Sequence, residues 1–95
     1  MKKLVDNGNI LELESAFPPH SLSSWTSFVT GNFQGKHGIY SMQIQKKNSY
    51  DFFVPDRTHI KGEKLYEILS NNGKKVCFIN LPLSYPAMDV NGLIV

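Results

Sequence analysis

The stretch from Lys61 to Asn80 constrains the fold most, because it predicts a helix followed directly by a strand. The apolar positions of its first half recur at helical spacing: Leu65, Ile68 and Leu69. Gly73 then marks the end of the helix. The run from Val76 to Ile79 is short, continuous and apolar, which is typical of a fully buried strand. A helix, a short turn and a buried strand form half of a parallel-sheet unit, so the sequence predicts an α/β fold.

A second helix is predicted between a proline pair and a glycine. Pro18-Pro19 requires extended backbone before the helix, and Gly31 is suited to a left-handed residue after it. We expect the helix to begin at about Ser23 or Ser24, with one of these two side chains as its cap, and to end at Thr30. Its apolar face is predicted to lie in the core: Trp25, Phe28 and Val29. Thr26 and Thr30 are expected to hydrogen bond back to the preceding turn.

The remaining segments give weaker patterns. Residues 1–7 resemble the last turn of a helix, 9–15 a short strand or extended segment, and 39–44 a possible strand. We expect a loop from 32 to 38, a surface excursion over 45–59, and mostly loop over 81–95. Because one buried strand cannot form a sheet, the chain is predicted to be a slice of a larger α/β domain.

Composition excludes several classes of protein. The chain has 95 residues, 41% of them hydrophobic, and a net charge of +2, which is too small to favour nucleic acid or an anionic membrane. Its single cysteine, Cys77, rules out an internal disulfide and is expected to be a buried thiol. No run approaches the length of a membrane span, and the N-terminus is not a signal peptide. We therefore expect a reduced, cytoplasmic setting.

One family is suggested by motifs spread along the chain. The run PPHSLSSWTSFVTG covers residues 18–31, and GKHGIY covers residues 35–40. Together they resemble the nucleophile region of the alkaline phosphatase superfamily, in particular its type I phosphodiesterase and nucleotide pyrophosphatase branch and the related predicted phosphohydrolase/phosphomutase group. The similarity continues in order through residues 65–69, 73–76, 79–82, 85–86 and 90–92.

The resemblance implies hydrolysis of phosphate esters at a site with two divalent metals, usually zinc. It assigns Ser21 to the nucleophile, which also contacts metal, and Ser24 to the position of an asparagine that donates to the phosphate. A helix N-terminus suits such a site, because its free N–H groups and positive dipole end attract phosphate oxygens. Two metals can activate the hydroxyl and hold the attacking and leaving oxygens in line. The implied fold is a three-layer parallel-sheet domain, of which residues 1–95 would form a part.

The resemblance also predicts which parts are missing. The family's first metal-binding aspartate ends an opening strand that this chain lacks, and Asp6 has a different context. The other aspartate and histidine ligands lie further downstream in the family. We therefore expect a fragment that binds no metal alone and is inactive alone, although the intact enzyme would act on a small phosphate ester.

A non-catalytic alternative remains open: a binding or interaction module on the same scaffold. An exposed sheet edge would favour a complementing chain or self-association. The three histidines, His20, His37 and His59, are too irregularly spaced for a local metal site, and His37 is expected to bond the backbone in a loop. Lys36 is expected to be solvated, with binding of an anion near the helix as the alternative. Asp51 and Asp56 are expected to lie in a solvated loop, and their spacing is only a weak indication of acid/base chemistry.

Overall fold

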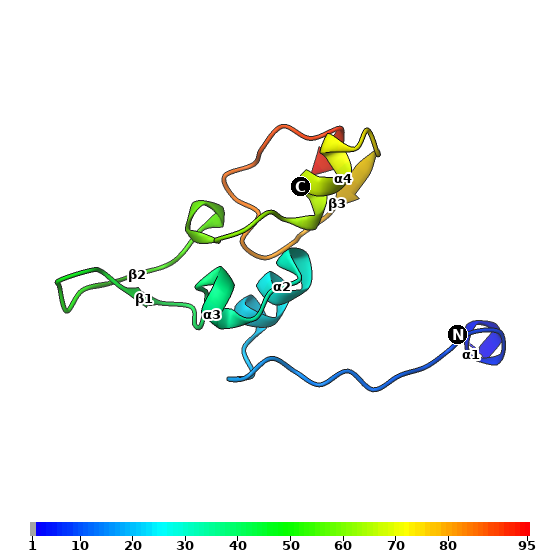
Figure 1. Cartoon of the computed structure of the whole chain (residues 1–95), viewed down its shortest axis with the longest axis horizontal. Coiled ribbons are helices and arrows are strands. Elements are labelled where there is room, and N and C mark those ends of the chain that lie inside the picture. The colour runs from blue at the N-terminus through cyan, green and yellow to red at the C-terminus, as the bar shows by residue number, and fades with distance from the viewer. Residues whose placement is uncertain (1) are drawn as a thin grey trace.

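The computed structural model describes residues 2–95, which form four short α-helices, one 3₁₀ turn and two separate two-stranded sheets. The chain is elongated, with extents of 53 × 31 × 20 Å. Figure 1 shows a central body, a hairpin reaching out from it on one side, and a helix at the end of a long extended segment on the other. The predicted α/β class is confirmed in this coarse sense.

The body is built from two helices and one small sheet. Helix α2 (Ser21–Thr30) contacts α4 (Leu65–Asn71), and α4 in turn packs on strand β3 (Val76–Phe78). Its apolar core consists of Val29, Tyr66, Val76 and Leu81, with Leu69, Phe78, Met88, Val90 and Ile94 packed against it. The rings of Tyr66 and Phe78 meet edge to face with centroids 5.6 Å apart, which is a favourable aromatic geometry.

Strand β4 (Gly92–Ile94) runs parallel to β3, with Val76 opposite Gly92 and Phe78 opposite Ile94. The prediction that residues 81–95 are mostly loop is confirmed, but β4 at the end of this segment was not predicted. Gly92 is required there, because an added Cβ would overlap the carbonyl oxygen of Val76. The glycine that marked a loop in the sequence thus permits the close approach of two strands.

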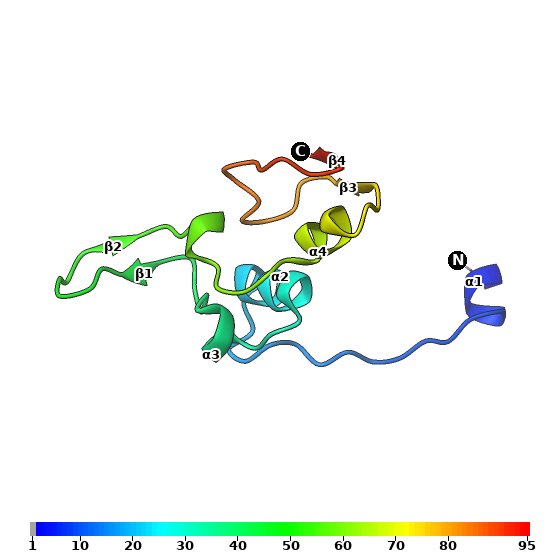
Figure 2. The ribbon, with the colours of Figure 1, turned by 45° about the horizontal axis from the view of Figure 1, so that its top comes forward.

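Two intermediate segments differ from the prediction. Helix α3 (Gln34–His37) replaces the predicted loop, and the possible strand over 39–44 reduces to β1 (Ile44–Gln45). Strand β1 pairs with β2 (Phe52–Phe53) as an antiparallel hairpin that projects from the body (Figure 2). This agrees with the surface excursion predicted for residues 45–59.

The 3₁₀ turn η1 (Arg57–His59) attaches the hairpin to the C-terminal segment. The Asp56 carboxylate accepts a hydrogen bond from the backbone N–H of Thr58 at 2.8 Å and so begins the turn. The Arg57 side chain then donates through Nε to the Pro86 carbonyl at 2.6 Å, and its backbone N–H donates to the Tyr85 carbonyl. Residues 29 positions apart in sequence are joined in this way.

Several residues predicted to be buried lie in solvent. Trp25 and Phe28 are 45% and 60% exposed, and only Val29 of that predicted face is buried. On α4 the buried residue is Tyr66, whereas Leu65 and Ile68 are exposed. Helical spacing correctly predicted that these side chains share one face of their helix. In so small a body, however, only a narrow strip of each helix packs against another element.

Strand β3 is likewise buried only in part. Val76 is buried and Phe78 is half-buried, while Cys77 is exposed, so the predictions of a fully buried strand and a buried thiol are wrong. Because side chains alternate along a strand, burial on one face leaves the other face bare unless a second layer covers it. Within residues 2–95, α4 packs on this sheet together with Leu81, Met88 and Val90 of the C-terminal segment. A three-layer domain stays a prediction.

The N-terminal segment makes little contact with the body. Helix α1 (Lys2–Asp6) has no buried residue, as expected for an isolated turn. Residues 9–14, called the arm below, are exposed along their whole length and belong to no strand, so they form an extended segment. The arm leads to Pro18-Pro19, after which α2 begins.

Candidate functional site: the N-terminus of α2

Helix α2 begins at Ser21, two or three residues earlier than predicted. His20 precedes it in extended backbone, and its carbonyl accepts the first intrahelical bond, from the Ser24 N–H at 2.9 Å. No side chain caps this end, so the predicted capping by Ser23 or Ser24 is wrong. The N–H groups of the first three helical residues have no intrahelical partner and are available to an anion.

The far end of α2 follows the prediction. Gly31 takes a left-handed conformation with φ of 63°, and its N–H donates to the Ser27 carbonyl at 2.9 Å. The hydroxyls of Thr26 and Thr30 donate to the carbonyls of Leu22 and Thr26, each at 2.7 Å. These bonds join residues four apart, which explains why the sequence alone was sufficient to predict them.

A groove of about 570 Å³ lies beside this helix start. It is called the Ser21 groove below and is lined by Ser15, Pro19, His20, Ser21, Ser24, Trp25 and Phe28. The structure thus brings the two site residues predicted from the resemblance, Ser21 and Ser24, to one groove. Ser21 is exposed at the first position of the helix, where its hydroxyl is accessible.

The groove also contains polar and aromatic groups that were not predicted as site residues. The Nδ1 atom of His20 is buried without a hydrogen-bond partner, so it can accept from or donate to a ligand. Trp25 is half exposed in the groove and meets Phe28 edge to face at 5.7 Å. The only signal for His20 in the sequence was its position next to Ser21. No carboxylate lines the groove, and the first turn of α2 contains no acidic residue.

Behind the groove, a buried polar pair joins α2 to α3. His37 is fully buried, and its Nε2 lies 3.0 Å from the Ser27 hydroxyl oxygen. Its Nδ1 accepts a hydrogen bond from the Ile39 N–H at 3.1 Å, which leaves the Nε2 proton for Ser27. Burial lowers the pKa of His37. The predicted bond from His37 to the backbone is confirmed, but it forms at the end of a helix and not in a loop.

The metal centre implied by the resemblance does not fit these residues. Among residues 2–95, no three side chains of His, Cys, Asp or Glu come together to hold a metal ion. Asp6 lies in α1, beyond the arm, and the groove provides serine hydroxyls and the His20 ring but no carboxylate. A site for two divalent metals needs several carboxylate or imidazole ligands, so Ser21 alone cannot form one.

No helix formed by residues 2–95 is both long enough and apolar enough to cross a membrane. The exposed lysines, including Lys36 within α3, are spread over the surface. Asp51 is exposed, as expected, whereas Asp56 is half-buried and serves as the cap of η1. The hydrogen bonds of Asp56, first of all from the Thr58 hydroxyl, lower the pKa of its carboxyl.

Comparison with known proteins agrees with the family suggested by the motifs. A family profile described as type I phosphodiesterase / nucleotide pyrophosphatase matches residues 1–92. No curated protein and no solved structure matches the chain. The profile spans both helices of the body, the Ser21 groove and the start of β4. The chain therefore belongs to the type I phosphodiesterase / nucleotide pyrophosphatase family.

Proposed function

We propose that this chain forms the nucleophile-bearing part of a metal-dependent phosphodiesterase or nucleotide pyrophosphatase. The observation that carries the proposal is the uncapped start of α2, where Ser21 and Ser24 line one groove in a chain of this family. In this proposal the free N–H groups of the first turn bind the phosphate oxygens. The absence of acidic residues from this turn keeps the electrostatic environment favourable for an anion.

Ser21 is the proposed nucleophile and Ser24 a proposed contact to the phosphate. The Ser21 oxygen would attack phosphorus, forming a new O–P bond while the bond from phosphorus to the leaving oxygen breaks and the hydroxyl proton is released to solvent. Two divalent metals, usually zinc in this family, would supply the activation of the hydroxyl and the stabilisation of charge. Ser24 lies one turn along the same helix and would donate its hydroxyl to a bound phosphate oxygen.

We further propose that the chain does not turn over substrate by itself. The support is the lack of a metal-binding group among residues 2–95, together with the high pKa of a serine hydroxyl that has no activating partner. The attack on phosphorus would therefore await ligands that these residues do not supply. Binding of an anion at the helix start does not need the metals and can be measured separately.

Anion binding is the first test, and the chain contains its own reporter. Trp25 is the only tryptophan and lies in the Ser21 groove. Titration with inorganic phosphate or vanadate should change its fluorescence in a saturable manner. Ser21→Asp should abolish the response, because the new carboxylate would repel the anion from the helix start. Ser41→Asp, a change at an exposed serine outside the groove, is the matched control and should leave the response intact.

Turnover is the second test. In the presence of Zn²⁺ or Mn²⁺, we expect the chain to show no Ser21-dependent hydrolysis of p-nitrophenyl phosphate or bis-p-nitrophenyl phosphate. Metal-dependent turnover abolished by Ser21→Ala would contradict the proposed inactivity while supporting Ser21 as nucleophile. Trp25 fluorescence that does not change on addition of either phosphate or vanadate would contradict the proposed phosphate site.

A second candidate function is a non-catalytic interaction module. It is favoured by one specific observation, the apolar outer face of the β3–β4 sheet, where Leu93 and Ile79 are 53% and 72% exposed. Phosphate binding separates the candidates: saturable binding reported by Trp25 favours the first, and a defined complex without phosphate binding favours the second.

A further inference from the structure

The β3–β4 sheet has one covered face and one bare face. Val76, Phe78 and Ile94 pack toward the core with α4, whereas the alternate side chains point outward. The exposed fractions on the outer face are 72% for Ile79, 53% for Leu93 and 66% for Val95. Parallel sheets are normally covered on both faces, so this face favours contact with another apolar surface.

The sheet also has an open edge along β3. The backbone of β3 bonds to β4 through alternate residues: Val76 donates to Asn91 at 2.9 Å, Phe78 accepts from Val95 at 2.9 Å, and Asn80 donates to Val95. The alternation directs the N–H and C=O groups of Cys77 and Ile79 to the other edge. Among residues 2–95, β3 has no strand partner except β4, so that edge can accept one more strand.

The arm has the pattern of a strand without a sheet. Leu11 and Leu13 alternate with Glu12 and Glu14, and the two leucines are 87% and 94% exposed. Such alternation is typical of a strand with one apolar face. The arm is already extended, so pairing it would require little further ordering of its backbone.

Charge favours one direction of pairing. Lys74 and Lys75 are exposed immediately before β3, and the arm carries Glu12 and Glu14. If the arm runs antiparallel to β3 with Leu13 opposite Cys77, Leu11 lies opposite Ile79 on the bare face, and Glu14 falls beside the lysine pair. A parallel arrangement with Leu11 opposite Cys77 would carry Glu14 away from these lysines.

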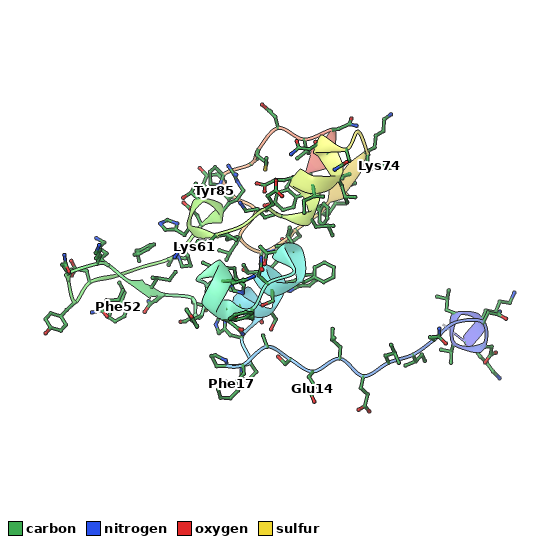
Figure 3. All side chains as sticks on the ribbon, in the orientation of Figure 1. Glu14, Phe17, Phe52, Lys61, Lys74 and Tyr85 are labelled. Carbon is green, nitrogen blue, oxygen red and sulfur yellow. The ribbon has the colours of Figure 1, made fainter. Side chains whose placement is uncertain are left out.

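The geometry of one molecule favours a second copy as the source of the arm. Figure 3 shows Glu14 on the extended segment at one side of the body and Lys74 at the opposite side. In Figures 1 and 2 the chain before α2 runs away from the body and ends in α1. A second molecule can present its arm without this separation, and two molecules can exchange arms symmetrically.

We propose that two copies of this chain form a closed dimer in which the arm of each pairs antiparallel with the free β3 edge of the other. Leu11 and Leu13 then cover the bare face of the sheet, and Glu14 meets Lys74 and Lys75. Leu13 and Glu14 line a second groove together with Ser24 and Phe28, but none of the pairing residues lines the Ser21 groove itself. Phosphate binding and dimerisation are therefore measured separately.

Disulfide trapping tests the register directly, because Cys77 is the only cysteine and is exposed on β3. In the variant Leu13→Cys, mild oxidation should give a covalent dimer that joins the new thiol of one copy to Cys77 of the other, since adjacent strands lie within disulfide reach. The control is Tyr50→Cys, because Tyr50 is also 94% exposed but lies in the β1–β2 hairpin loop. Leu13→Cys with Cys77→Ser should lose the product. Equal trapping in the control, or an intramolecular disulfide, would overturn the proposal.

Light scattering across a concentration series provides the second measurement. The unmodified chain should shift from monomer to dimer, and Leu11→Asp with Leu13→Asp should weaken the association about tenfold or more, because two leucines lose apolar contact. Leu4→Asp, at a residue of α1 that is 75% exposed, is the matched control and should change nothing. Circular dichroism should show an unchanged fold in both variants. A monomer at every concentration, or equal effects of the two variants, would overturn the proposal.

Discussion

The two halves of the body are held together by different kinds of contact. Around α2 and α3 the buried side chains are mostly polar: Ser23, Thr26, Gln34 and His37. Around α4 and β3 they are mainly apolar, namely Tyr66, Val76 and Leu81, and the buried charge of Lys64 is paired with Glu67 at 3.3 Å. Apolar burial is not directional, whereas a hydrogen bond fixes the distance and orientation of its partners. The arrangement of the half that bears Ser21 is therefore fixed mainly by the geometry of its hydrogen bonds. The other half is stabilised mainly by burial of apolar side chains.

The polar half carries a cost that the apolar half does not. The hydroxyl oxygen of Ser23 and the Nε2 atom of Gln34 are buried without hydrogen-bond partners. A buried polar group without a partner destabilises the folded state by about 1–3 kcal/mol. We infer that α2 and α3 form the less stable half, and the substitutions below test this difference in decreasing order of their predicted consequences.

The greatest loss of stability is expected in the apolar half, at Tyr66. Tyr66→Ala should lower the free energy of unfolding by about 3–5 kcal/mol, because it removes a large buried ring and leaves a cavity beside Phe78. Urea unfolding followed by circular dichroism measures this loss. Tyr50→Ala, at a ring that is 94% exposed, should change stability by less than about 0.5 kcal/mol. Similar losses for the two variants would show that the ring packing contributes little.

A smaller loss is expected at the polar pair that joins α2 to α3. Ser27→Ala and His37→Gln should each lower the free energy of unfolding by about 1–2 kcal/mol, because each breaks the 3.0 Å hydrogen bond. The double variant should lose less than the sum, since both changes remove the same bond. Strict additivity in this double-mutant cycle would mean that the pair does not fix α3 on α2.

The smallest of the three predicted effects on stability is its dependence on pH. Burial lowers the folded-state pKa of His37, so the unfolded chain takes up the proton more readily than the folded chain. The free energy of unfolding should be at its full value above pH of about 6.5 and fall as the pH decreases below it. The loss should level off below the folded-state pKa. Urea midpoints across this range measure it, and a slope that persists in His37→Gln would assign it to other groups.

Local features of the fold were predictable from the sequence. The turn at Gly31, the stop at Gly73 and the back-bonds of Thr26 and Thr30 all depend on residues within about one helical turn of each other. The parallel-sheet unit suggested by residues 61–80 was predictable for the same reason, since a helix, a glycine and an apolar run follow one another directly.

Contacts between distant segments were not predictable. Strand β4 was missed because three residues beginning with Gly92 form a strand only when β3 supplies the hydrogen bonds. Trp25 and Phe28 were placed in the core because their spacing is helical, but spacing cannot show whether a partner exists to cover them. The pairing of Ser27 with His37 depends on the turn between α2 and α3, which no local pattern indicated.

The candidate site divides in the same way. The order of residues along the chain was sufficient to identify the family and to place Ser21 between a proline pair and an apolar-faced helix. Three further features emerged only from the folded molecule: α2 begins at Ser21 without a cap, Ser21 shares a groove with Ser24 and Trp25, and the outer face of the β3–β4 sheet is bare. Exposure and close approach depend on how distant segments pack, and that information is spread over the whole chain.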